Sequence, residues 1–244
     1  MRFALPLLVR TVLAAAALAV VGLAAPPAAA KCMMPSAVLA PASGSVPVNP
    51  VLHLMVPTRT ANPPLPRVVA HRGDKQVPVT VTADTASGDL RTYRVVITAA
   101  AGPLKVELLD AQGTVMRSRT FTVDPHWQPP KVTTAAVTVT HDVSSWTCSH
   151  TRTRNLRFTG TAAAYRVVLA DAAAKTSIVV PADPGDYFHT PLAPPTDVDL
   201  ALGHVNCFGD TLEWTVDKIA TVHALLPDGN EQPVSRAPVV LAPP

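Results

Sequence analysis

Short apolar runs in which apolar and polar residues alternate recur along most of this chain, and they constrain its fold more than any other feature. Neighbouring side chains of a strand point to opposite faces, so this alternation predicts strands with one buried face. Asn, Asp, Pro and Gly, the residues of turns, separate the runs. Two alanine-rich stretches, Ala162–Ala164 and Ala172–Ala174, are too short for a stable helix. The pattern predicts an all-β protein.

The strands follow from the same pattern. We expect them at residues 51–56, 67–70, 77–81, 93–97, 104–109, 115–123, 135–140, 156–158, 165–170, 178–180, 198–202, 212–216, 220–226 and 231–234. Many short strands separated by turns are typical of two antiparallel sheets packed as a sandwich. A turn that contains Asp and Gly lies in the last hairpin of each half, at Asp110–Gly113 and at Pro227–Asn230. This similarity indicates two copies of a related architecture.

A proline-rich segment near the middle of the chain predicts a division into two domains. Residues 125–131 read Pro-His-Trp-Gln-Pro-Pro-Lys, and prolines of this kind form a semi-rigid connector. We therefore expect one domain at 31–124, a linker at 125–131 and a second domain at 132–244.

The first 30 residues have the pattern of a cleaved signal peptide. Arg2 and Arg10 provide the basic start, an apolar run extends from Thr11 to Ala25, and Ala28–Ala30 supplies small residues for cleavage. The run is shorter than the roughly 20 apolar residues of a membrane-spanning helix. We expect a secreted or periplasmic protein that begins at Lys31 and keeps no stable membrane span.

Charge and motifs limit the classes of function. Without Arg2 and Arg10 the mature chain has 18 Lys and Arg against 17 Asp and Glu, a formal net charge of +1. That balance offers no electrostatic surface for nucleic acid. The sequence also contains no nucleophile elbow, zinc-protease helix or phosphate-binding loop. We therefore expect no enzymatic activity and no cofactor.

One stretch resembles a known family. Residues 41–54 contain the pattern Pro-x-x-Gly-x-Val-Pro-x-Asn before a strand, which is similar to the opening of bacterial Ig-like domains. The resemblance implies two Ig-like antiparallel β-sandwich domains in tandem. It also implies a spacer, adhesion or accessory role, as a non-catalytic module of the cell envelope or secreted fraction. The partner would be an unknown protein or an envelope polysaccharide.

Three cysteines in an exported chain allow at most one intramolecular disulfide. Cys148 and Cys207 are the expected pair, since both lie in the second half beside strand-like segments and an oxidising compartment favours the bond. Trp146 and Trp214 would then pack near it. Cys32 is then the expected unpaired thiol, and bridging to another chain or competition for one of the other two cysteines are the alternatives that three cysteines leave open. Lipidation of this cysteine is disfavoured because Lys31 occupies the position where a lipoprotein signal needs a small residue.

Soft ligands leave a metal-handling alternative open. His53 and Met55 share one face of a predicted strand, and Cys32 precedes two methionines, a set that suits copper. Periplasmic copper carriers have a similar lead-in, but they use the mature N-terminal amine as a ligand. His150 and His204 lie close in sequence to Cys148 and Cys207 and could complete a zinc site if the thiols stayed reduced. We favour a purely structural role over metal binding for these two residues, with Met55 in the core and His53 near a sheet edge.

Overall fold

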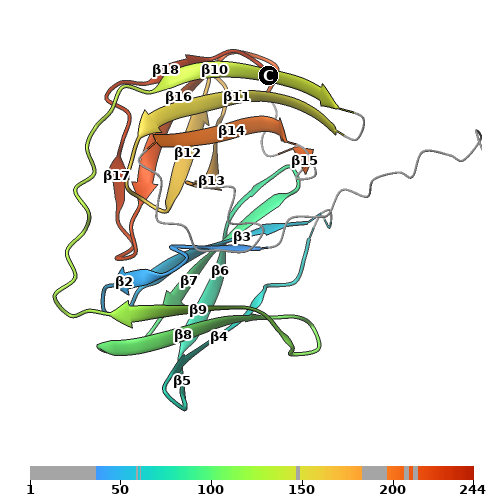
Figure 1. Ribbon diagram of the computed structural model, residues 1–244. Helices are drawn as coiled ribbons and strands as arrows, with labels where there is room; N and C mark the ends of the chain where they lie inside the picture. The colour runs from blue at the N-terminus through green and yellow to red at the C-terminus, as the bar shows by residue number, and fades with distance from the viewer. Residues whose placement is uncertain are drawn as a thin grey trace, which may run out of the picture. The chain divides into compact units, whose positions relative to one another are not determined.

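The computed structural model describes residues 37–58, 60, 62–146, 149–182, 197–205, 209–210 and 214–244. The described residues all belong to one compact unit, Met34–Pro244. Every regular element among the described residues is a strand (Figure 1). In this part of the chain no helix is long and apolar enough to cross a membrane.

Strands of the first half form two sheets. The first sheet has the order β1 (Val38–Ala40), β3 (Val51–Pro57), β7 (Leu90–Ile97), β6 (Val79–Ser87). The second sheet has the order β2 (Gly44–Val46), β9 (Val115–Val123), β8 (Gly102–Leu109), β4 (Arg67–Arg72), β5 (Lys75–Val77). All their pairings are antiparallel except β2 with β9. We call β1–β9 the N-terminal sandwich.

Strands of the second half repeat this plan. One sheet has the order β10 (Thr138–Trp146), β11 (Ser149–Thr159), β14 (Asp197–Val205), β15 (Gly209–Asp210). The other has the order β13 (Lys175–Pro181), β12 (Ala164–Ala170), β16 (Lys218–Leu225), β17 (Glu231–Pro233), and β18 (Val239–Leu241) also pairs with β16. We call β10–β18 the C-terminal sandwich.

Both sandwiches have an immunoglobulin-like strand order. An Ig domain places strands A, B, E and D in one sheet and C, F and G in the other. The strands β1, β3, β7 and β6 occupy the first set, and β4, β8 and β9 occupy the second. In the C-terminal sandwich, β10, β11 and β14 correspond to A, B and E, while β12, β16 and β17 correspond to C, F and G. The prediction of an all-β protein built from Ig-like antiparallel sandwiches is confirmed. The signal peptide at 1–30 lies outside the described residues, and the boundaries 31–124, 125–131 and 132–244 stay predictions.

Most predicted strands are present, and the exceptions have local causes. The strand expected at 212–216 is wrong over its described part, because Trp214–Val216 is irregular. The indole Nε1–H of buried Trp214 donates to the carbonyl of Leu241 at 3.3 Å, so this residue packs into the sandwich instead of extending a sheet. The strands that were not predicted are β1, β2, β15 and β18, since each has only two or three residues and shows no periodicity.

Alternation produces the two cores. In β7 the residues Leu90, Thr92, Tyr93, Val95 and Ile97 are buried, and the last three pack inside the N-terminal sandwich. The core of the C-terminal sandwich contains side chains from both its sheets, and the same cluster continues into the N-terminal sandwich through four residues, Val38, Ala40, Met55 and Leu90. The two sandwiches therefore share a buried apolar contact.

The two last hairpins have the same turn. Asp110 donates its N–H to Thr114 at 2.9 Å, and Gly113 donates to Asp110 at 3.1 Å. In the other hairpin Leu226 donates to Asn230 at 3.0 Å and Gly229 donates to Leu226 at 2.9 Å. The glycines have φ angles of 88° and 85°. This is a three-residue loop with glycine at the left-handed position, so both predicted turns are confirmed.

These glycines form a matched pair for mutation. A Cβ at Gly113 would lie 3.8 Å from its nearest neighbour, Arg67 Nη1, whereas a Cβ at Gly229 would lie 2.9 Å from Arg94 Nη2 and 3.1 Å from Val51 Cγ2. Gly113→Ala is expected to cost about 1 kcal/mol for the left-handed backbone alone. Gly229→Ala is expected to cost about 1 kcal/mol more, because it also pushes against the N-terminal sandwich. Urea unfolding of both variants measures the difference, and equal losses would contradict a close contact at this turn.

Candidate functional site

Strand β3 is buried on both faces, and the candidate site lies beside its outer face. Leu52 and Leu54 face the interior of the N-terminal sandwich, while Val51, His53 and Met55 face the other way and are buried as well. Antiparallel sheets commonly leave one face in water. Here β13 of the C-terminal sandwich contacts β3 and β6, and it contributes fully buried Val179. The outer face of this sheet is therefore an interface between the two sandwiches.

Arg166 of β12 connects the two sandwiches through charge. Its Nη2 donates to Asp84 Oδ2 on β6 at 2.9 Å, and its Nε donates to Glu231 Oε1 on β17 at 3.0 Å. The side chains of Arg166 and Asp84 are each 15% exposed. Burial lowers the pKa of Arg166, but the hydrogen bonds and charges of Asp84 and Glu231 outweigh it, and the pKa is raised. The guanidinium stays charged, and it bridges carboxylates from both sandwiches.

His53 lies beside this bridge without joining it. The residue is 6% exposed, and its Nδ1 is 3.8 Å from Asp84 Oδ2, too far for a hydrogen bond. Burial lowers the pKa of His53 to about 4, against the carboxylate of Asp84, which raises it, and with Arg166, which lowers it further. The imidazole is therefore neutral at pH 7, and its Nδ1 is buried without a hydrogen-bond partner.

The turn at Gly229 brings backbone groups of the two sandwiches together. The N–H of Val51 at the start of β3 donates to the carbonyl of Pro227 at 2.7 Å. This bond satisfies a buried donor at the beginning of the strand. The loop between β16 and β17 is thus fixed against the N-terminal sandwich.

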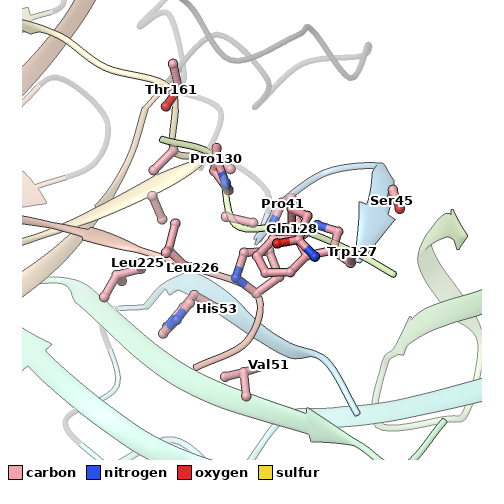
Figure 2. A pocket seen from close by; sticks show the side chains of 15 residues that line it. Pro41, Ser45, Val51, His53, Trp127, Gln128, Pro130, Thr161, Leu225 and Leu226 are labelled. Atoms are coloured by element: carbon pink, nitrogen blue, oxygen red, sulfur yellow. The ribbon is translucent and has the colours of Figure 1, made fainter. Parts of the chain in front are cut away.

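A cavity of about 270 Å³ opens beside this contact. We call it the junction cleft. Both sandwiches and the proline-rich linker contribute to it, and the labelled linker side chains Trp127, Gln128 and Pro130 lie among those of the two sandwiches (Figure 2). Its lining residues are Ala40, Pro41, Ser45, Val51, His53, Trp127, Gln128, Pro130, Thr161, Ala162, Ala163, Ala164, Leu225, Leu226 and Pro227.

A small turn fixes the linker wall of the cleft. Asp124 donates its N–H to Val46 at 2.8 Å and accepts at its own carbonyl from Trp127 at 3.2 Å. Its carboxylate accepts from the N–H of His126 at 2.8 Å. This Asx turn ties the linker to the end of β2 and positions Trp127.

Tyr165 fixes the opposite wall. Its hydroxyl accepts a hydrogen bond of 3.0 Å from the N–H of Ala162, and its ring packs edge-to-face on Phe158 at 4.9 Å. The bond resembles the tyrosine corner of Ig sandwiches, where a buried tyrosine hydroxyl holds backbone a few residues upstream. Burial raises the pKa of Tyr165 to about 12, so the hydroxyl stays protonated. The segment from Thr161 to Ala164 is held in place by this contact.

The chemistry of the junction cleft suits binding. Proline, alanine, leucine and valine form most of its wall, and His53 is the only titratable group among the described residues that line it. Because the described lining holds no second titratable group beside the neutral His53, its residues do not form an acid–base pair. Apolar walls with a few hydroxyl and amide groups are the usual composition of ligand sites.

The structure places some of the predicted metal ligands and leaves others open. His53 and Met55 share a face of β3 as expected, but His53 is not near an edge, because β3 pairs with β1 on one side and β7 on the other. His150 and His204 lie in neighbouring strands β11 and β14, and only their backbone is described.

All three cysteines, Cys32, Cys148 and Cys207, lie outside the described residues. No group of three or more His, Cys, Asp or Glu suited to a metal occurs among the residues that are described. The disulfide and both metal alternatives stay predictions.

Sequence reasoning missed the residues that build this site. Asp84, Arg166 and Glu231 belong to strands far apart in the sequence, and Trp127 was assigned only to a linker. One available signal was Arg166, a cation at the second position of the otherwise apolar predicted strand at 165–170. A charge at that position indicates a partner across an interface.

Comparisons with known proteins add little. No family model matches the sequence, and no curated protein matches it. Among solved structures, a pullulanase type I from Bacillus subtilis str. 168 complexed with maltose is similar with a TM-score of 0.25 and 8% identity, over 83% of this chain and 24% of that one. A pullulanase from Anoxybacillus sp. LM18-11 complexed with maltotriose gives a TM-score of 0.23 and 9% identity, over 78% and 27%. This chain spans about a quarter of the length of those proteins. Similarity at this level carries no argument about function.

The Arg166 bridge predicts a specific loss of stability. Arg166→Met removes the guanidinium partner of the mostly buried Asp84 carboxylate, which is 15% exposed, and is expected to lower the free energy of unfolding by about 2 kcal/mol or more. The matched control is Arg157→Met, because Arg157 pairs with Asp199 at 2.7 Å where the side chains are 55% and 41% exposed. That surface pair is expected to contribute less than about 1 kcal/mol. Equal effects in urea unfolding would show that the bridge does not join the sandwiches.

His53 predicts a dependence of stability on pH. The folded-state pKa of about 4 lies below the ordinary 6.5, so as pH falls from 6.5 toward 4 the unfolded chain binds a proton that the folded chain does not. The neutral His53 contributes stability above pH 6.5, and this contribution is lost as the pH falls through this window. The free energy of unfolding falls by about 3 kcal/mol in all, of which about 1.5 kcal/mol is lost between pH 6.5 and 5. His53→Gln removes this loss, whereas His126→Gln, at an exposed position, leaves it unchanged. Identical pH profiles for wild type and His53→Gln would refute the assignment.

Proposed function

We propose that this protein is an exported, non-catalytic binding module of the cell envelope or secreted fraction. Its two Ig-like sandwiches act as one unit, and the partner engages that unit outside the cytoplasm. The observation that carries the proposal is the shared interface, in which Arg166 bridges Asp84 and Glu231 beside the junction cleft. The signal-like residues 1–30 and the resemblance of 41–54 to bacterial Ig-like domains support the location and the class.

The interface gives the module a function that separate spacers would lack. Domains joined only by a flexible linker move independently. A binding site that is built from both domains is then formed for only a fraction of the time. The contact between Val51 and Pro227, the shared apolar cluster and the buried ion pair hold the two walls of the junction cleft together. A preorganised site binds without the cost of ordering its walls. Envelope polysaccharide or an envelope protein is the class of partner that the location offers.

The proposal is tested on protein produced with residues 1–30 in place. We expect recovery from the periplasm or medium with an intact mass that begins at Lys31, one disulfide, one free thiol, and no stoichiometric copper or zinc by elemental analysis. We also expect the mature protein to co-sediment with isolated envelope material in a saturable way, with unlabelled protein competing.

Three outcomes would overturn it. Protein that remains in the cytoplasm with residues 1–30 attached would remove the location. Co-sedimentation that never saturates would remove specific binding. Bound zinc or copper with reduced cysteines would replace the module by the metal-handling alternative.

A further inference from the structure

The dimensions of the junction cleft fit one ring-sized group. Sites for drug-sized ligands usually have volumes of roughly 300–1,000 Å³. At about 270 Å³ the junction cleft is slightly smaller than that range. It accommodates a single ring of a larger molecule whose remainder stays in solvent.

Charge excludes an ionic ligand group. None of the described lining residues is Lys, Arg, Asp or Glu, and the nearby charges of Arg166, Asp84 and Glu231 are already paired with one another. His53 is uncharged at neutral pH. A charged ligand group would lose its hydration in this cleft and gain no ionic partner, so the ligand group is neutral.

The lining combines a flat aromatic group with hydroxyl and amide groups. Trp127 is half-buried in the linker, and the turn at Asp124 holds its backbone. Ser45, Gln128 and Thr161 are exposed and line the same cleft. A sugar ring has apolar C–H faces and a polar edge of hydroxyl groups. Its faces suit an indole and aliphatic walls, and its hydroxyls suit serine, threonine and glutamine at the exposed positions.

We propose that the junction cleft binds one neutral pyranose residue of a polysaccharide, which packs on Trp127 and donates or accepts hydrogen bonds with Ser45, Gln128 and Thr161. This inference rests on the proposed function and specifies its partner as envelope or extracellular polysaccharide. Because the site uses one ring, the rest of the polymer lies outside it, and affinity for short oligosaccharides is modest. The linker then forms part of the binding site as well as connecting the sandwiches.

The test titrates the mature protein with defined trisaccharides. The neutral probes are maltotriose, cellotriose and tri-N-acetylchitotriose, the acidic probe is trigalacturonic acid, and the peptide probe is a proline-rich decapeptide. Isothermal calorimetry and tryptophan fluorescence report binding. We expect at least one neutral trisaccharide to bind, with trigalacturonic acid at least about tenfold weaker, equivalent to about 1.4 kcal/mol.

Variants connect that binding to the junction cleft. Trp127→Ala is expected to weaken the best trisaccharide at least about tenfold, and Trp127→Phe to weaken it less, because a ring remains. Met116→Ala is the matched control, since Met116 is 61% exposed and does not line the junction cleft. Unfolding curves of Trp127→Ala that match the wild type show that the loss is local.

The results separate failure of this inference from failure of the proposed function. No binding of any neutral trisaccharide, binding that Trp127→Ala leaves intact, or preference for the acidic or proline-rich probe would overturn the sugar site. If envelope co-sedimentation persists in those cases, the proposed function stands and only its partner changes. If co-sedimentation is absent as well, both fail.

Discussion

Arg166 is the constraint on which the arrangement of this protein depends. A guanidinium on a mostly buried strand face needs carboxylates within hydrogen-bond distance, because its hydration is lost. Glu231 in the same sheet supplies one, and Asp84 of the other sandwich supplies the second. The ion pair is favourable only when the two sandwiches are in contact. It therefore specifies how they meet more than it adds to stability, since the desolvation of such groups offsets much of their attraction.

The contact between the two sandwiches determines which residues on the outer face of β3 are buried. The outer face of β3 would otherwise expose Val51 and Met55 to water, and the C-terminal sandwich covers them. This burial is unfavourable for His53, which lies beside the ion pair with an Nδ1 that has no hydrogen-bond partner. A neutral imidazole tolerates this position better than a charged one, and the lowered pKa expresses that difference. The junction cleft lies where covering is incomplete and the linker forms part of the wall.

Local features of the sequence were sufficient to predict the strands and the class of fold. The alternation in residues 115–123 and the two glycine turns depend on neighbours a few positions away, and the structure contains them. The interface could not be predicted in the same way, because Asp84 and Arg166 are 82 positions apart and only tertiary structure brings them together. The sequence of β3 did indicate that this strand is covered on both sides. Its run Val51-Leu52-His53-Leu54-Met55 is apolar on both faces except for one histidine, a pattern that fits a strand covered on both sides.

The two copies of the Ig-like plan also show why repeated architecture does not repeat function. Each copy has the same three-residue turn in its last hairpin, with nearly equal hydrogen-bond lengths and glycine φ angles. A Cβ at Gly113 would meet nothing closer than an arginine side chain at 3.8 Å, while Gly229 lies against Val51 and Arg94 of the other copy. Local sequence therefore specifies the conformation of the turn. The residues packed around the turn decide whether it contacts the other sandwich. In this chain the residues with a candidate function are those where the copies differ, namely the turn that contacts the other sandwich and the linker that occurs once.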